Sequence, residues 1–393
     1  MSEDLETHRP VTGDVAGRLR DALESSSYDP EGMALCMSGG GYKSGAYQLG
    51  ALIRLNELGL LRRLKRISSV SGGSITNAYL GLKWRSLDWS DKSVARNLHE
   101  EVVRPLQRFY TQIDSDFWNI ALGLALPGRS GADGVEKTYR KHLFQDATLQ
   151  DFPDEPDAPR FVILATNFEL NTVWRFAKPY AADYRVGEVR APRFPLSKIV
   201  AASSGFPPFF CPITIDLAGT QLNHFEGADR HRPPYTQRLK LADGGVYDNM
   251  GLEPIWKRYG VLLVSNAGDP FDESTDPPRH WMPVLRRCLS MIHRQAENNR
   301  VRWLLSLAIS KRRALAYWPL RNAVSDYAAR GTLSMSPEDA EAAQNEPVRL
   351  KSLGFEAFQR LVRLGYSLSD AAVRSYIAPG APPPSDWPNL PSR

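Results

Sequence analysis

The sequence has few cysteines and lacks a long apolar run. Its three cysteines, Cys36, Cys211 and Cys288, are widely spaced and form no C-x-x-C pair, so we expect neither a disulfide framework nor a zinc site. We also expect no other metal and no cofactor. This usage favours a reducing compartment. No apolar run approaches the ~20 residues that a membrane-spanning helix needs. The polar segment Met1 to Pro10 also lacks the apolar stretch of a secretory signal peptide, which predicts a cytoplasmic protein with at most peripheral membrane contact.

The charge balance gives no indication of a nucleic-acid partner. Lys and Arg number 49 against 44 Asp and Glu, so the net charge is +5 over 393 residues. Such a small excess is compatible with a weak preference for anionic membrane surfaces, although a solvated basic face is its commoner origin. Hydrophobic residues make up 42% and charged residues 24% of the chain, which is typical of a globular protein with a sizeable core.

Strand-like apolar runs alternate with helical ones, and this alternation predicts an α/β fold with a central, mostly parallel sheet flanked by helices. The first unit is a strand at 33–37, a triple glycine and a helix that ends near Gly59. The second is a strand at 64–70, a turn and another helix. Further strands are expected at 160–166, 212–217, 239–242 and 260–265.

Ser71 has the setting of a nucleophilic serine. It stands in Ser69-Val70-Ser71-Gly72-Gly73, between a β-branched run and a helical run, where a sharp turn exposes the hydroxyl above the sheet edge. Small neighbours such as Gly72 and Gly73 are needed because such a turn is crowded and strained. The pattern is G-x-S-x-G with Ser69 in place of the first glycine. Taken alone, a serine in a glycine-rich turn is more often only a turn residue.

The triple glycine Gly39-Gly40-Gly41 opens a helix directly after a strand. Backbone N–H groups in such a loop can converge on an anion near the helix N-terminus, which is how an oxyanion hole is formed. A dinucleotide-binding interpretation is weaker, because Ser44 stands where the third glycine belongs, and Tyr42 interrupts a phosphate-loop pattern before Lys43. A plain strand-to-helix connection is the remaining alternative.

Asp243 follows the apolar run 239–242 and precedes Gly244-Gly245, so a permissive turn presents its carboxylate at a strand end. A general base belongs at such a place, although an Asx turn explains most Asp-Gly pairs. None of the seven histidines has a comparable setting. His224 and His231 fall in a polar loop, which leaves a Ser-His-Asp triad open but unsupported.

The order S-G-G-G-Y-K-S, then S-V-S-G-G-S, then A-D-G-G-V-Y-D-N resembles that of patatin-like phospholipases, in particular their bacterial soluble members. The resemblance covers about residues 33–251. It implies a serine lipid acyl hydrolase with a lipid substrate and a Ser-Asp dyad, in which Ser71 is the nucleophile and Asp243 the base. It also assigns Gly39-Gly40-Gly41 to the oxyanion hole.

Three residues depart from the family pattern. Ser69 replaces a glycine, Lys43 stands where the family usually has arginine, and Ser44 stands where a glycine usually follows. Lys43 keeps the charge of arginine but loses its planar fork, so we expect the departures to affect how tightly the loop is held. An acyltransferase with the same dyad and a lipid-binding module without turnover remain alternatives.

Composition, patterning and the resemblance together suggest four segments along the chain. They are a loose N-terminus (1–30), a patatin-like catalytic domain (31–275), a helical extension packed on the core (276–377) and a Pro-rich disordered tail (378–393). Within them, the apolar stretch 206–210 is expected in the core, and 117–126 is either core or a lid. The basic amphipathic helix after Leu285 is expected to dock its apolar side on the protein rather than on a membrane.

Overall fold

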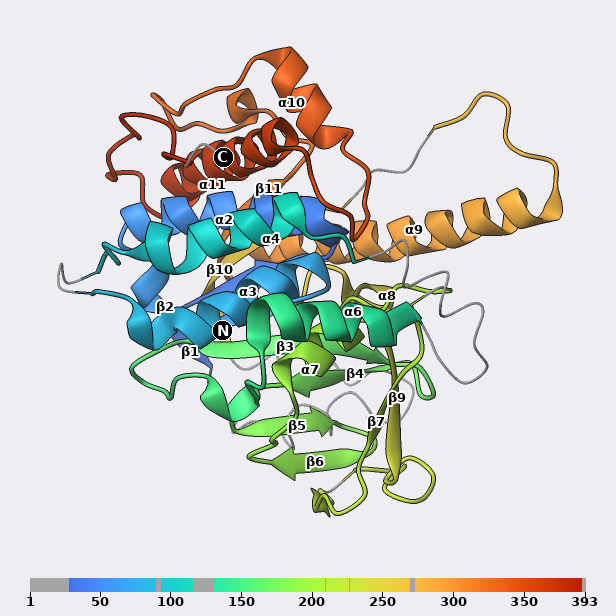
Figure 1. Ribbon diagram of the computed structural model, residues 1–393. Helices are drawn as coiled ribbons and strands as arrows, with labels where there is room; N and C mark the ends of the chain where they lie inside the picture. The colour runs from blue at the N-terminus through green and yellow to red at the C-terminus, as the bar shows by residue number, and fades with distance from the viewer. Residues whose placement is uncertain are drawn as a thin grey trace.

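Five parallel strands form the centre of the fold, which is a computed structural model that describes residues 28–89, 93–115, 131–208, 210–225, 227–268 and 273–390 (Figure 1). In spatial order the strands are β11 (Ala314–Pro319), β10 (Tyr259–Asn266), β1 (Asp29–Met37), β2 (Leu64–Ser69) and β3 (Arg160–Asn167). The predicted α/β class, with a parallel central sheet between helices, is confirmed.

Beyond β3 the sheet continues with antiparallel strands. These are β4 (Thr172–Phe176), β5 (Tyr180–Asp183), β6 (Gly187–Arg190) and β8 (Leu222–Asn223). A branch is formed by β9 (Arg238–Asp243), which pairs with the end of β3 and with β7 (Ile213–Asp216). The sequence did not predict β4 to β6 and β8, because strands of two to five residues are too short to show a periodic pattern.

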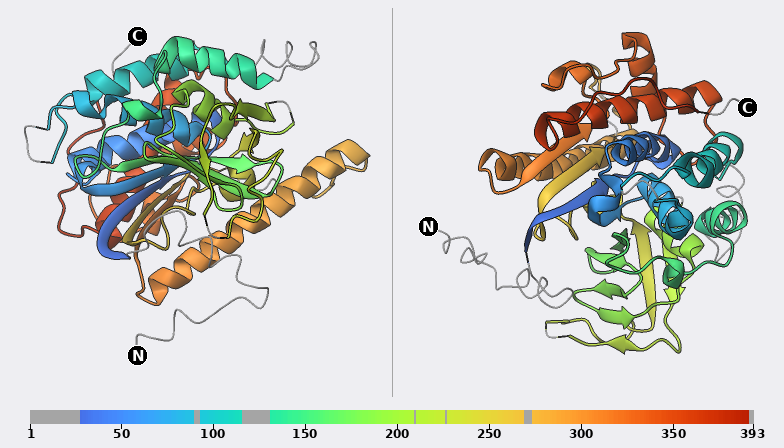
Figure 2. Two further views of the ribbon diagram at one scale, coloured as in Figure 1. Left: turned by 90° about the horizontal axis from the view of Figure 1, so that it is seen from below. Right: turned by 90° about the vertical axis from the view of Figure 1, so that its left-hand side faces the viewer.

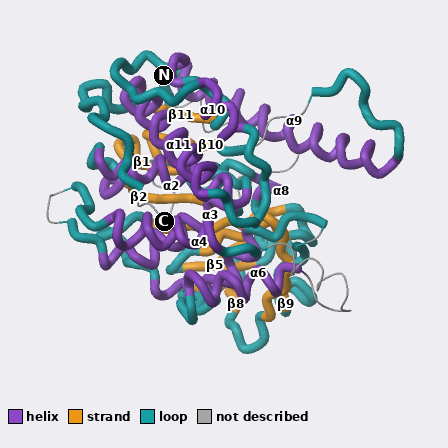
Figure 3. The backbone as a smooth tube through the Cα atoms, turned by 45° about the horizontal axis from the view of Figure 1, so that its top comes forward, coloured by secondary structure: helices purple, strands orange, loops and turns teal. Residues whose placement is uncertain are grey.

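Helices cover both faces of the parallel strands (Figure 2, Figure 3). Met33, Leu35 and Met37 of β1 belong to the large core that includes α2 (Gly41–Glu57) and α11 (Phe355–Tyr376). Ala34 and Cys36 belong to a second core that includes Leu304 of α9 (Trp281–Ile309). Burial on both faces explains why the central strands read as continuous apolar runs.

The remaining helices and helical turns connect these layers. The helices are α3 (Gly72–Lys83), α4 (Arg104–Gln112), α6 (Gly131–Tyr139), α7 (Leu196–Ser203), α8 (Gly245–Asp248) and α10 (Pro337–Gln344). Short 3-10 or π turns occur at Leu61–Arg63, Trp84–Ser86, His99–Val103, Arg140–Phe144, Leu149–Asp151 and Val324–Asp326. Within the described ranges, every helix is too short or too polar to span a lipid bilayer.

Two glycines allow α2 and α11 to cross closely. A Cβ on Gly50 would lie 1.9 Å from the carbonyl oxygen of Val362, and one on Gly365 would lie 1.9 Å from that of Tyr47. Next to this crossing, Arg54 of α2 donates to the fully buried Asp370 of α11 over 2.8 Å. The C-terminal helix is therefore part of the core.

Two of the four expected segments differ in structure from what their sequences suggest. Residues 276–377 are not a purely helical extension, because β11 joins the sheet beside β10. The Pro-rich tail is also packed as far as the structure describes it: Arg54 donates to the carbonyl of Pro382 over 2.7 Å, and Leu390 is buried. Proline lacks an N–H group, but its carbonyl can still accept a hydrogen bond. The proposed lid at 117–126 lies outside the described residues, as does most of the segment 1–30.

The prediction for the basic helix is correct for only half of α9. In its C-terminal part Leu304 is buried, and the rings of Trp303 and Trp256 lie 4.0 Å apart. In its N-terminal part the apolar residues Trp281, Leu285 and Leu289 are exposed. Figure 1 shows α9 extending beyond the rest of the chain. Amphipathic spacing predicts an apolar face, but not which turns of the helix have a neighbour to bury it.

Candidate active site

The strand registers bring Ser71 and Asp243 to the same level of the sheet. Ser69, at the end of β2, pairs with Ile163 of β3, and two residues further along β3 Ala165 pairs with Asp243. Val70 continues the alignment by donating its N–H to the carbonyl of Met37 at the end of β1. The loops that follow β1, β2 and β9 therefore meet at one edge.

Ser71 occupies a strained turn between β2 and α3. Its φ is 51° and its ψ is −123°. Residues other than glycine rarely adopt this backbone conformation, and when they do it is often at a functional site. A Cβ on Gly72 would lie 1.8 Å from the carbonyl oxygen of Gly41, and one on Gly73 would lie 2.6 Å from that of Met37. The turn thus requires both glycines, as the sequence pattern predicted.

A buried hydroxyl network supports this turn from below. Ser203 Oγ of α7 accepts the backbone N–H of Ser71 over 3.0 Å and lies 2.9 Å from Ser74 Oγ. Ser69 Oγ accepts hydrogen bonds from Ser74 Oγ at 3.0 Å and from Asn77 Nδ2 at 2.8 Å. The serine that replaces the family glycine is therefore a member of the network. Sequence analysis missed Ser203, because its contact with Ser71 spans 132 residues.

Only two of the three predicted oxyanion donors are available. The N–H of Gly39 already donates to the carbonyl of Asn249 over 3.0 Å. Among the described residues, no acceptor bonds the N–H of Gly40 or of Gly41, which lie at the start of the 17-residue helix α2. Their φ values of 137° and 58° differ from ordinary helical geometry. Two adjacent donors at a helix N-terminus form a favourable site for negative charge.

Lys43 and Ser44 hold the glycine loop from two sides. Ser44 Oγ donates to the carbonyl of Ser38 over 2.7 Å, within the loop itself. Lys43 is only 1% exposed, and its Nζ donates to the carbonyl of Gln344 at the end of α10 over 2.8 Å. The N–H of Tyr42 donates to the carbonyl of Arg349 over 3.0 Å. A C-terminal segment, invisible to local sequence patterns, therefore packs on this loop.

The backbone and side chain of Asp243 are both fixed. Its N–H donates to the carbonyl of Gly205 over 2.9 Å, and its carbonyl accepts from Thr166 Oγ1 over 2.7 Å. One carboxylate oxygen accepts the N–H of Gly245 over 2.7 Å. Burial raises the pKa of Asp243 to about 7, against the lowering effect of hydrogen bonds from Gly245 and from the side chain of Ser71. Gly244 is also required, since a Cβ there would lie 2.5 Å from the carbonyl of Leu164.

No histidine contributes to the environment of Asp243 within the described parts of the chain. The ring of His231 forms a hydrogen bond through Nδ1 with the carbonyl of Val186 over 2.8 Å. The centroids of the His224 and His231 rings lie 5.1 Å apart. Val186 immediately precedes β6, in the antiparallel extension of the sheet. Both candidate triad histidines therefore have structural neighbours of their own.

Two further groups lie near Asp243 and were not predicted. Burial and the negative charge of Asp243 raise the pKa of Tyr139 on α6, and burial together with the same charge raises the pKa of Cys211 to about 11. Cys211 follows Phe210, which packs against the large core, whereas Phe206 is exposed. The core prediction for the stretch 206–210 therefore holds for Phe210 and fails for Phe206.

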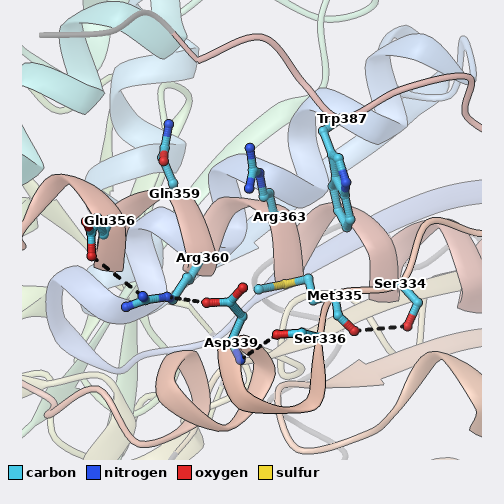
Figure 4. Close-up of a pocket in the computed structure, with 9 residues that line it drawn as sticks. All are labelled: Ser334, Met335, Ser336, Asp339, Glu356, Gln359, Arg360, Arg363 and Trp387. Carbon is cyan, nitrogen blue, oxygen red and sulfur yellow. Dashed lines mark hydrogen bonds and ion pairs between the residues drawn. The ribbon is translucent and has the colours of Figure 1, made fainter.

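One pocket lies away from the edge of the sheet that carries Ser71 and Asp243. A pocket of about 300 Å³ lies between α10 and α11, where Arg360 bonds Asp339 and Trp387 forms part of the wall (Figure 4). None of its lining residues is a predicted site residue. The described part of the chain contains no group of three or more His, Cys, Asp or Glu side chains arranged to hold a metal ion.

The protein is thus an α/β protein in which a serine turn, a glycine loop and an acidic turn meet at one edge of a parallel sheet. Residues 35–256 match the family described as Patatin-like phospholipase. The chain belongs to that family, a class of lipid hydrolases, as its motifs indicated. No curated protein sequence matches the chain at a significant level.

A solved structure of a phospholipase shares the fold. Human GIVD cytosolic phospholipase A2 superposes with a TM-score of 0.54 at 15% identity, and the match covers 92% of this chain and 61% of that one. VipD from Legionella pneumophila matches with a TM-score of 0.33 at 14% identity, covering 87% and 68%. This chain therefore spans less than two thirds of the length of the human enzyme. At these identities the likeness concerns the fold alone.

Proposed function

We propose that the protein is a serine lipid acyl hydrolase that cleaves fatty acyl esters, such as those of glycerophospholipids, through an acyl-Ser71 intermediate. The observation that carries the proposal is the pairing of the strained Ser71 with the buried Asp243, whose pKa of about 7 suits a base at neutral pH. Membership of the patatin-like phospholipase family supports the choice of a lipid ester.

In the proposed mechanism Asp243 acts on Ser71 directly. The carboxylate takes the hydroxyl proton as Ser71 Oγ attacks the acyl carbonyl carbon, and the new oxyanion is bound by the N–H groups of Gly40 and Gly41. The ester C–O bond then breaks, and Asp243 returns the proton to the leaving alkoxide. In the second half, Asp243 deprotonates a water molecule that attacks the acyl-enzyme. Collapse of this second intermediate releases the fatty acid and reprotonates Ser71.

The same dyad would support acyl transfer if an alcohol or thiol displaced water in the second half. A catalytically inactive lipid-binding module would need neither the strained turn nor a base with a raised pKa. Product analysis by mass spectrometry, with purified protein and mixed phospholipid vesicles, separates the three. Free fatty acid indicates hydrolysis, a new acyl ester on an added alcohol indicates transfer, and binding without turnover indicates the inactive module.

Replacement of the nucleophile provides the direct test. Ser71→Ala should abolish both turnover and labelling by a fluorophosphonate probe, because it removes the only group that forms the acyl bond. Ser334→Ala is the matched control, since the hydroxyl of Ser334 is exposed and bonds only the carbonyl of Met335 in the described residues. If Ser71→Ala is still labelled, a different serine is the nucleophile and the proposal is wrong.

A further inference from the structure

The N-terminal half of α9, residues 281–295, carries a group of exposed apolar side chains. Trp281 is 74% exposed, Leu289 58% and Ile292 63%. We call residues 281–295 the projecting half. Residues 297–309, which include the buried Glu297 and Leu304, are called the anchored half. Figure 1 shows the helix reaching past the other elements.

Four of the exposed apolar side chains of the projecting half lie along one face. Trp281, Leu285, Leu289 and Ile292 follow one another at spacings of four, four and three residues, so they share one side of the helix. Cys288, also exposed, falls on the same side. No described residue covers this face. A contiguous exposed apolar surface of this kind marks an interaction site in a folded protein.

The charge of the projecting half indicates the class of partner. Four arginines lie between residues 279 and 294, and no Asp or Glu occurs from residue 277 to residue 296. Arg286 falls at the flank of the apolar face. A second copy of the chain would bring an equal positive charge to the contact, which opposes self-association. The surface therefore fits an anionic partner with an apolar interior.

The anchored half connects this surface to the edge that carries Ser71. Glu297 accepts a hydrogen bond from Asn266 at the end of β10 over 2.7 Å. The guanidinium of Arg300 lies 3.8 Å from the carboxylate of Asp248. Asp248 ends α8, which begins two residues after Asp243. The projecting half is thereby joined, through one continuous helix, to the edge of the sheet where Asp243 lies.

We propose that the projecting half of α9 is the element that docks the protein on anionic lipid bilayers. The helix would lie in the plane of the interface, with Trp281, Leu285 and Leu289 among the acyl chains and its arginines at the phosphates. The choice of a bilayer over an acidic protein rests on the proposed function, because a lipid hydrolase must reach aggregated substrate.

Sedimentation with vesicles tests the proposal without requiring turnover. The full chain carrying Ser71→Ala is mixed with vesicles of pure phosphatidylcholine, or of equal parts phosphatidylcholine and phosphatidylserine. We expect binding to the anionic vesicles that weakens as salt is raised. R279Q/R286Q should weaken it by about twenty-fivefold, because each arginine near an anionic surface contributes about fivefold. L285S/L289S should weaken binding to the same vesicles by at least as much.

Matched controls lie at the other end of the same helix. Leu305 and Ile309 are exposed apolar residues of the anchored half, and Arg302 and Arg312 are exposed arginines in it or just beyond it. L305S/I309S and R302Q/R312Q should bind anionic vesicles as the parent does. Because all eight side chains are exposed or nearly so, unchanged circular dichroism and melting temperature should show that every variant is folded.

Three results would overturn the docking proposal. They are binding that does not change in the projecting-half variants, equal binding to neutral and anionic vesicles, and a dimer in analytical ultracentrifugation that these variants dissolve. Failure of the proposed function is seen separately. With Ser71 intact, hydrolysis of a water-soluble short-chain ester should be unchanged in all α9 variants, and its absence from the parent protein would refute the hydrolase while leaving the vesicle result standing.

Discussion

Raising the pH through neutrality should increase the rate of ester hydrolysis at Ser71. Asp243 can take the serine proton only when it is ionised, and burial raises its pKa to about 7. Below that value the carboxyl group is protonated, and the hydrogen bonds from Gly245 and Ser71 are not sufficient to keep it charged. In a Ser-His-Asp triad the histidine would titrate instead, so the pH profile must be combined with substitutions.

The expected magnitude follows from the ionised fraction. With a single pKa near 7, kcat/KM falls about tenfold per pH unit on the acid side, so at pH ~5 about one hundredth of the plateau value remains. The assay is hydrolysis of a water-soluble ester, which avoids any effect of pH on vesicles. His224→Ala and His231→Ala should leave both the plateau and the midpoint unchanged. A loss of several powers of ten in either variant, with the protein folded, would refute the dyad.

The same carboxyl group should also make stability depend on pH. Its pKa in the folded state lies above its ordinary value of 3.8, so the folded state holds the proton more tightly than the unfolded state does. The stabilisation is therefore complete below pH ~4 and is lost as pH rises through ~7, by up to about 4 kcal/mol. Asp243→Asn, which is always neutral, should melt increasingly above the parent between these limits. A constant difference in melting temperature would show that Asp243 is already ionised at low pH.

Three further substitutions test the packing around the site. Gly72→Ala should abolish fluorophosphonate labelling, because its Cβ would lie 1.8 Å from the carbonyl of Gly41. Gly50→Ala should lower the melting temperature strongly, or prevent folding, because the methyl group would lie 1.9 Å from the backbone of α11. The control is Gly380→Ala, which should leave the melting temperature unchanged, because Gly380 is exposed and has no neighbour within 4 Å. Asp370→Asn should cost about 3–5 kcal/mol in urea unfolding, since it removes a fully buried carboxylate that pairs with both Arg54 and Arg374. Wild-type stability in Gly50→Ala or in Asp370→Asn would contradict the packing described.

Local patterns predicted the features whose determinants are close in sequence. The serine turn, the glycine loop and the acidic turn each depend on a strand followed within three residues by small side chains, so a short stretch contains all the information. The parallel arrangement of β1, β2 and β3 follows from the same alternation of strands and helices. The relation of Ser71 to Asp243 came instead from the family resemblance, because no local pattern encodes a contact across 172 residues.

Features set by distant contacts were not predictable in this way. Ser203 is an ordinary helix-terminal serine in the sequence, and only the fold brings its hydroxyl beneath Ser71. The hydrogen bond that occupies the N–H of Gly39 goes to the carbonyl of Asn249, which reaches it from the turn after α8. The strand β11 was missed because α9, with 29 residues, separates it from the rest of the sheet.

The family match ends at residue 256, but the site cannot be understood from those residues alone. The side chain of Lys43 finds its acceptor at Gln344, and the N–H of Tyr42 finds its acceptor at Arg349. A buried ammonium group without an acceptor is costly, so the loop that presents Gly40 and Gly41 depends on α10 and on the segment after it. Arginine at position 43 would need space for a larger planar group in the same buried setting. The departure from the family residue is thus matched to the C-terminal segment of this chain, and the two should be exchanged together in any chimaera with a relative.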